Sequence, residues 1–164
     1  MRKILIPIDE KQSGEAQIEF LLKHELPEDA EITLLTVVRT FALQDYGYNV
    51  QRAYFDLIIQ EDTRLANILQ DEMEKLLRTR FANTKLIRSI KTGAPVKEIL
   101  KHARENGVDW IIMGAHGRAG LDKLFLGSVS QSVVNQAACS VTIVRIPINV
   151  EGPEKKAELM APAR

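Results

Sequence analysis

Short apolar runs alternate along this chain with stretches whose apolar residues recur at helical spacing. Each run is too short for a core helix, is rich in Ile, Leu and Val, and ends at a turn or a charge, as strands buried on both faces of a parallel sheet do. Parallel neighbours need long crossovers, and the helical stretches between the runs supply them. Strands are predicted at residues 2–8, 32–38, 85–92, 110–113 and 141–146.

Four helices are predicted between these strands. Their ranges are about 14–25, about 57–82, a third from the turn Gly93-Ala94-Pro95 to a stop at Gly107, and a fourth that begins near Ser128. Pro at a first helical position and Gly just past the end are typical helix boundaries. Residues 39–55 show no clear period and are predicted to be a long connection. The pattern predicts an α/β fold, a single-domain three-layer α/β/α sandwich around a five-stranded parallel sheet.

The predicted domain spans residues 1–148, and the Pro- and charge-containing residues 149–164 are predicted to be a flexible tail. The run at 85–92 alternates apolar residues with Lys85, Arg88 and Lys91, which favours a strand at the edge of the sheet. His24 and His102 have no partner at metal-ligand spacing, so no metal site is predicted.

Composition excludes several classes of protein. The chain has 164 residues, with 22 Lys and Arg against 22 Asp and Glu, so it lacks the basic excess of a nucleic-acid binder. No stretch reaches the roughly 18 apolar residues of a membrane span. A single cysteine, Cys139, offers no internal disulfide, and a cytoplasmic location is expected.

The predicted carboxyl ends of the strands are where a ligand is expected, because open parallel sheets bind ligands at that edge. Asp9, Val37 and Gly114 fall there. Glycines after the fourth strand let several N–H groups converge, and the start of a helix at Ser128 adds the positive end of a dipole, so this segment suits a phosphate. Ser128 is also predicted to cap that helix, with Gln131 completing a capping box.

The spacing Gly114-x-x-Gly117, nine residues, then Gly127-Ser128, placed after a strand and before a helix, resembles the ATP-binding motif of the universal stress protein family. The resemblance covers most of residues 2–146. It implies a Rossmann-like sheet of strand order 3-2-1-4-5 that binds an adenine nucleotide, with ATP as the ligand and Mg²⁺ as a plausible companion. It also implies a homodimer through the last strand, Val141 to Ile146, whose unpaired edge would pair with a second copy.

The resemblance carries roles over to particular positions. Asp9 and Val37 would hold adenine and ribose, and Met113 and Gly114 would line the pocket. The remaining candidate residues, near ribose, phosphates or the strand ends, are Pro7, His116, Gly117, Arg118, Gly127, Ser128, Val129 and Ser130. His116 is either a phosphate contact or a solvated loop residue, and Arg118 either counters phosphate charge or is an exposed cation. Glu10 to Ser13 and Ser140 depart from the usual family pattern.

The leading functional hypothesis is a nucleotide-binding stress-response protein whose conformation is read by an unidentified protein partner. No evident pair of general base and nucleophile accompanies the glycines, so any hydrolysis should be slow. An interaction module of the same fold that binds no nucleotide is the main alternative. A phosphoacceptor receiver domain is disfavoured, because the third strand ends Lys91-Thr92-Gly93 without an acceptor aspartate. A dinucleotide oxidoreductase and a P-loop NTPase lack their glycine motifs.

Overall fold

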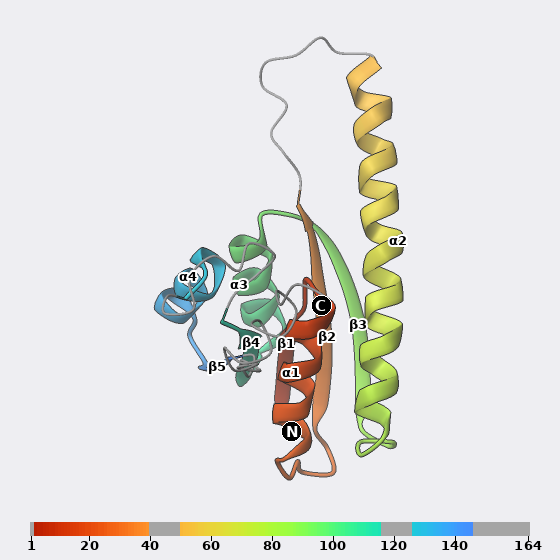
Figure 1. Cartoon of the computed structure of the whole chain (residues 1–164). Helices are drawn as coiled ribbons and strands as arrows, with labels where there is room; N and C mark the ends of the chain where they lie inside the picture. The colour runs from red at the N-terminus through yellow and green to blue at the C-terminus, as the bar shows by residue number, and fades with distance from the viewer. Residues whose placement is uncertain (1, 40–49, 116–125, 146–164) are drawn as a thin grey trace, which may run out of the picture.

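A computed structural model of the chain describes residues 2–39, 50–115 and 126–145, with residues 50–54 described by their backbone alone. The elements in chain order are β1 (Lys3–Pro7), α1 (Lys11–Leu22), β2 (Glu31–Arg39), α2 (Val50–Arg78), β3 (Lys85–Gly93), α3 (Pro95–Asn106), β4 (Trp110–Gly114), α4 (Ser128–Gln136) and β5 (Ser140–Val144), as Figure 1 shows. The sheet is parallel throughout, with strand order β3-β2-β1-β4-β5. The predicted α/β class and strand order are confirmed.

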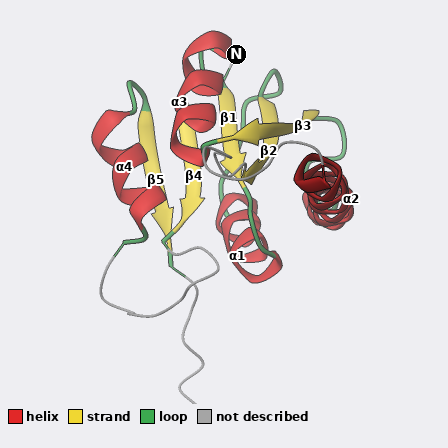
Figure 2. Ribbon diagram, turned by 90° about the horizontal axis from the view of Figure 1, so that it is seen from above, coloured by secondary structure: helices red, strands yellow, loops and turns green. Residues whose placement is uncertain are grey.

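Helices cover both faces of the sheet. Figure 2 shows α1 and α2 on one side and α3 and α4 on the other. Successive side chains of a strand point to opposite faces, so Ile4 and Ile6 pack in a core beneath α1 and α2, while Leu5 packs in a second core beneath α3 and α4. This explains why the strands show continuous apolar runs in the sequence.

Several predicted boundaries hold. Pro95 is the first residue of α3, and Gly107 ends that helix with a left-handed φ of 62°. β3 lies at one edge of the sheet and β5 at the other. α4 begins at Ser128.

Other boundaries were predicted wrongly. α1 begins at Lys11 rather than 14, because its buried face includes Ser13 and Gln17, two polar residues that an apolar stripe does not reveal. α2 begins at Val50 rather than 57, so part of the predicted 39–55 connection is helix. The helices also end early, α1 at Leu22 and α2 at Arg78.

The predicted capping box of α4 is absent. The N-cap residue is Gly127, and it makes no side-chain cap hydrogen bond. Ser128 is already the first helical residue, so its hydroxyl cannot play the N-cap role, which belongs to the residue before the first turn. Among the described helices, none is both long enough and apolar enough to cross a membrane. The predicted tail, 149–164, lies outside the described residues.

Candidate functional site

The carboxyl ends of β1 and β4 meet at the centre of the sheet, where the strand order reverses. β1 pairs with β2 on one side and with β4 on the other. The helices that follow these two strands, α1 and α4, lie on opposite faces of the sheet (Figure 2), and open parallel sheets bind ligands at such a point. Pro7, the last residue of β1, is buried. Asp9 follows two residues later, half-buried, just before α1. Both residues thus lie at the carboxyl edge of the sheet, where the sequence predicts a ligand.

The start of α4 is held against the ends of β4 and β5 by a short series of hydrogen bonds. The Gly127 N–H donates to the Ala115 carbonyl at 2.7 Å, and the Ala115 N–H donates to the Val144 carbonyl at 2.9 Å. The Ser130 hydroxyl donates to the Gly114 carbonyl at 2.7 Å and is buried. The helix start is therefore positioned by the sheet itself.

The first turn of α4 has the properties of an anion site. The first N–H groups of a helix have no intrahelical acceptor, and the macrodipole places partial positive charge there. Ser128 is exposed and Val129 half-buried. The turn contains no acidic side chain, so an approaching phosphate meets no local negative charge from it. The Ser130 hydroxyl already donates to the Gly114 carbonyl, so Ser130 can offer an anion only its backbone N–H.

Gly114 has a packing role that the sequence did not reveal. A Cβ built there would lie 2.0 Å from Ser13 Oγ and 3.1 Å from Gln17 Nε2. Ser13 and Gln17 are both buried, and the Gln17 amide donates to Ser13 Oγ at 3.2 Å. Glycine is thus required for α1 to approach the end of β4. The sequence feature that could have indicated this close approach is the pair of small residues Ser13-Gly14 shortly after the first strand.

Val37 and Met113 lie near the same edge but differ in what they expose. Met113 is 4% exposed, and its side chain packs in the core beneath α3 and α4. Val37 is half-buried and packs against that same core. Met113 can therefore offer a ligand its backbone, whereas Val37 retains some accessible side chain.

Lys11, one of the described residues near this edge, forms an ion pair with a carboxylate on another helix. Its Nζ lies 3.0 Å from Glu72 Oε2 on α2, and that hydrogen bond, with the attraction of the carboxylate, raises the pKa of Lys11. Its charge is thereby directed toward α2. Within the described ranges, no group of His, Cys, Asp and Glu side chains is arranged to hold a metal ion. His116, Gly117 and Arg118 lie outside the described residues.

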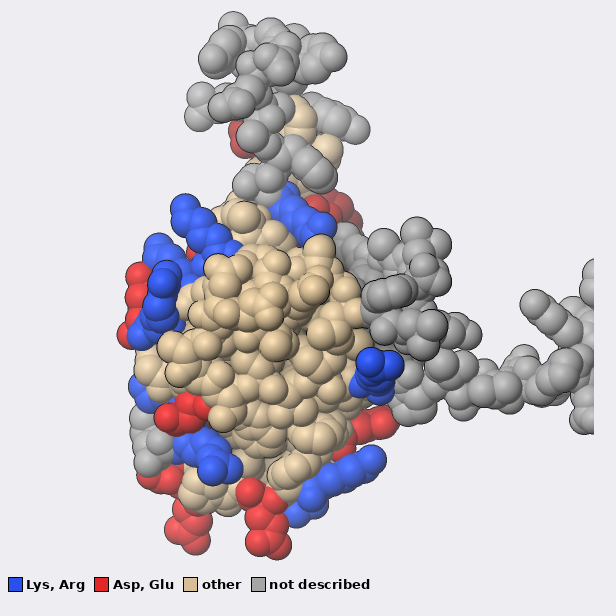
Figure 3. All heavy atoms as spheres, turned by 90° about the vertical axis from the view of Figure 1, so that its left-hand side faces the viewer, with Lys and Arg blue, Asp and Glu red and all other residues tan. Residues whose placement is uncertain are grey.

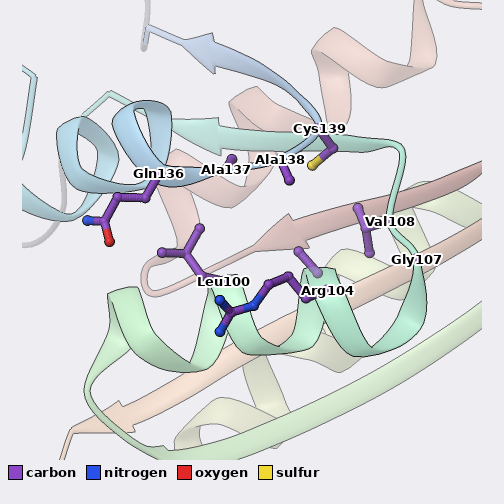
Figure 4. Close-up of a pocket in the computed structure, with 9 residues that line it drawn as sticks. Leu100, Arg104, Gly107, Val108, Gln136, Ala137, Ala138 and Cys139 are labelled. Atoms are coloured by element: carbon purple, nitrogen blue, oxygen red, sulfur yellow. The ribbon is translucent and has the colours of Figure 1, made fainter.

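A separate hollow of about 280 Å³ lies at the opposite, amino end of β4 and β5. Figure 4 shows it between α3 and the segment that joins α4 to β5. It is lined mainly by apolar atoms, with residues including Leu100, Ala103, Arg104, Gln136, Ala137 and Cys139. Burial, and to a smaller degree the Asp109 carboxylate, raises the pKa of the Cys139 thiol. A protonated thiol among apolar groups fits the predicted packing role of this cysteine.

A five-stranded parallel sheet whose order reverses between β1 and β4, with helices on both faces, defines a Rossmann-like α/β domain. The model of the universal stress protein family matches residues 1–145. The chain belongs to the universal stress protein family.

Known relatives agree with this membership. A universal stress protein of Methanothermobacter thermautotrophicus is 34% identical over 149 residues, which is 88% of this chain and 95% of that protein. The structure of UspA from Lactobacillus plantarum has a TM-score of 0.74 at 23% identity and covers 88% of this chain and 97% of its own. A family protein of Arabidopsis thaliana with AMP bound has a TM-score of 0.60 at 16% identity, covering 95% and 99%. The two structures show the shared fold.

Proposed function

We propose that this protein binds an adenine nucleotide, ATP in particular, at the carboxyl edge of β1 and β4. The observation that carries the proposal is the start of α4, which the Gly127–Ala115 and Ser130–Gly114 hydrogen bonds hold at the point where the sheet order reverses. A fixed set of N–H groups there binds phosphate without reorganisation and without a basic surface. This agrees with a chain whose formal charges sum to zero.

The parts proposed for the candidate residues come from the family resemblance and from where the described residues lie. The half-buried Asp9 carboxylate would accept hydrogen bonds from adenine N6 or a ribose hydroxyl, and Val37 would contact the ring. The backbone of Met113 and Gly114 would form the floor between them. The N–H groups from Ser128 onward would face the phosphates, together with His116, Gly117 and Arg118, which directly follow the end of β4 in the sequence. Mg²⁺ would accompany ATP through the phosphates, as it usually does in proteins.

The proposed role is regulatory. AMP bound to the Arabidopsis relative supports an adenine nucleotide as the ligand class, although that likeness is one of fold. A ligand shifts a conformational equilibrium only through its different affinity for the two states. ATP would stabilise one arrangement of α4 against β4 and β5, and a protein partner would recognise it.

Isothermal titration with ATP, AMP and GTP tests this proposal. Gly127→Arg places a long side chain at the helix start without backbone strain, because φ of Gly127 is −60°, and it should abolish the ATP heat. Ala138→Arg, at an exposed position at the opposite end of the sheet, is the matched control and should bind like the parent. An absence of heat for every nucleotide, together with no nucleotide released from denatured purified protein, would favour the non-binding interaction module.

We also propose a homodimer through β5, as predicted for Val141 to Ile146. The Ser140 N–H and the Val144 carbonyl both bond toward β4, so by strand alternation the polar groups of Val141 and Ile143 point to the open edge. Figure 3 shows a broad face almost free of charged side chains on this side of the molecule. α4 and β5 contain no charged residue. Both features suit pairing with a second copy.

Proline substitutions distinguish the two edges of β5. Ile143→Pro removes an N–H that faces outward, so light scattering should report loss of the dimer while circular dichroism stays that of the parent. Thr142→Pro removes an N–H directed at β4 and should instead destabilise the sheet. A dimer that survives Ile143→Pro would contradict pairing through this edge.

A further inference from the structure

The helix α2 is longer than the sheet it covers. It has 29 residues, which make about 43 Å at 1.5 Å per residue, whereas β2 and β3 have nine each, about 30 Å. Figure 1 shows the first part of α2 standing beyond the sheet. Among its described side chains the buried ones begin only at Ala66 and continue with Gln70, Met73 and Leu77. The first half of the helix is therefore held by little of the protein's own core.

Between residues 57 and 68 the helix carries a second stripe of side chains, here called the outer stripe. Its members follow one another at spacings of four, three and four, the spacing of a coiled-coil seam, and they are Leu57, Glu61, Arg64 and Ile68. At 100° per residue they lie on the side of the helix opposite Ala66 and Gln70. Leu57 is 62% exposed and Ile68 is 44% exposed.

Two more large apolar side chains border the outer stripe. Ile58 and Leu65 lie seven residues apart on one flank and are 38% and 47% exposed. An exposed cluster of large apolar side chains on a projecting helix marks an interaction surface. The arrangement of the charges within the stripe indicates which partner it suits.

We propose that the outer stripe pairs with the same stripe of a second copy of this chain, with the two helices antiparallel. A two-fold axis between Asp62 and Thr63 places Leu57 opposite Ile68 of the second copy. The same axis places Glu61 opposite Arg64 of the second copy, and the reciprocal pair forms by symmetry. The contact thus has apolar ends and two complementary ion pairs at its centre.

The charge pattern selects this orientation. Parallel helices in register would place each Glu61 opposite Glu61 and each Arg64 opposite Arg64, and such like-charge contacts are unfavourable. Within one copy, Arg64 Nη2 lies 2.7 Å from Glu61 Oε1, with side chains 58% and 55% exposed. Both groups remain accessible on the helix surface, so they can form a four-membered network when the second helix arrives.

The contact is compatible with the proposed β5 dimer. α2 covers β2 and β3, and β5 is the strand at the other edge of the sheet. Figure 2 shows α2 and β5 at opposite ends of the molecule. Each copy can use both surfaces at once, so the outer stripe would join β5 dimers into larger assemblies.

Charge reversal in the full-length chain tests the proposal by sedimentation velocity at high micromolar concentration. Glu61→Arg alone and Arg64→Glu alone each create like-charge contacts across the axis and should weaken association through α2 by more than about tenfold. An equal mixture of the two variants restores every opposite-charge pair between unlike copies. The mixture should therefore sediment faster than either variant by itself.

Two further variants complete the test. The double variant Glu61→Arg/Arg64→Glu preserves both the pair within one helix and the pairs across the axis, so it should self-associate like the parent. Asp56→Arg makes the same change of charge on another face of α2 and should leave association unchanged. The proposal is overturned if the mixture gives a sedimentation profile that is the sum of the profiles of its two variants. It is also overturned if the double variant fails to associate. Packing of any other partner on this face would give those two results.

Discussion

The close approach of α1 to the end of β4 makes Gly114→Ala the most informative single substitution. The added methyl group would lie 2.0 Å from Ser13 Oγ and 3.3 Å from Ser13 Cβ. The Ser13 hydroxyl can rotate away, but Ser13 is 1% exposed, so its surroundings leave little room for rotation. α1 must therefore shift, and overpacking of this kind costs about 1–3 kcal/mol.

A double-mutant cycle separates this clash from any general intolerance of alanine. Ser13→Ala removes the oxygen at 2.0 Å and leaves contacts of 3.1 Å with Gln17 Nε2 and 3.3 Å with Ser13 Cβ, which require shifts of only a few tenths of an ångström. It also removes the acceptor of the Gln17 amide, a loss of about 1 kcal/mol. We expect Gly114→Ala to lower the free energy of unfolding by about 2 kcal/mol in the parent, within the overpacking range, and by less than about 1 kcal/mol in the Ser13→Ala chain.

Urea unfolding of the four proteins, followed by circular dichroism, measures the cycle. Unchanged m-values would show that the differences arise from stability rather than from altered compactness. Strictly additive effects of the two substitutions would refute the reasoning, because they would mean that the methyl group and the hydroxyl do not compete for the same space.

Three other predictions concern groups away from the site. The pKa of His102 is lowered from its ordinary value of 6.5, first by burial and then by Lys91, so the unfolded chain binds the proton more readily. Stability therefore falls as the pH drops through 6.5 toward the lower pKa of the folded state, and His102→Gln should flatten urea midpoints measured over that range. The buried Gln70 amide donates to the Leu34 carbonyl, Thr36 Oγ1 and the Ser89 carbonyl, so Gln70→Met should cost about 1–3 kcal/mol in a thermal melt. Because burial raises the pKa of Cys139, its alkylation at neutral pH should be slower than that of a free thiol, and an equal rate would contradict this packing.

The strands were predictable because burial on both faces leaves a strong local signal. Ile4 to Ile6 face two different cores in alternation, so every position is apolar whichever way it points. The start of α2 left no such signal. Residues 50–56 lie beyond the sheet (Figure 1), and the apolar period that predicts this helix begins only at 57.

The candidate-site residues at the strand ends could be predicted from the sequence. The residues that hold those strand ends and the start of α4 in place were harder to predict. Asp9 and Gly114 fall where parallel strands must end, and that edge binds ligands in this class of fold. The predicted Ser128 cap was wrong, because the choice of N-cap depends on where the chain leaves the sheet. The Gly127 N–H bonds to Ala115, which places Gly127 just outside the helix and Ser128 inside it.

By itself the sequence determined the class of fold and the approximate strands, and it predicted the edge at which a ligand would bind, because apolar period and glycine spacing are local properties. The tertiary structure decided which residues support that edge. Ser13 and Gln17 are polar residues that pack against the end of β4 because Gly114 has no side chain, and the buried Ser130 hydroxyl is satisfied by the hydrogen bond that it donates to the Gly114 carbonyl. Such pairings join residues that are distant in the chain, so their physical meaning exists only after the strands and helices have packed.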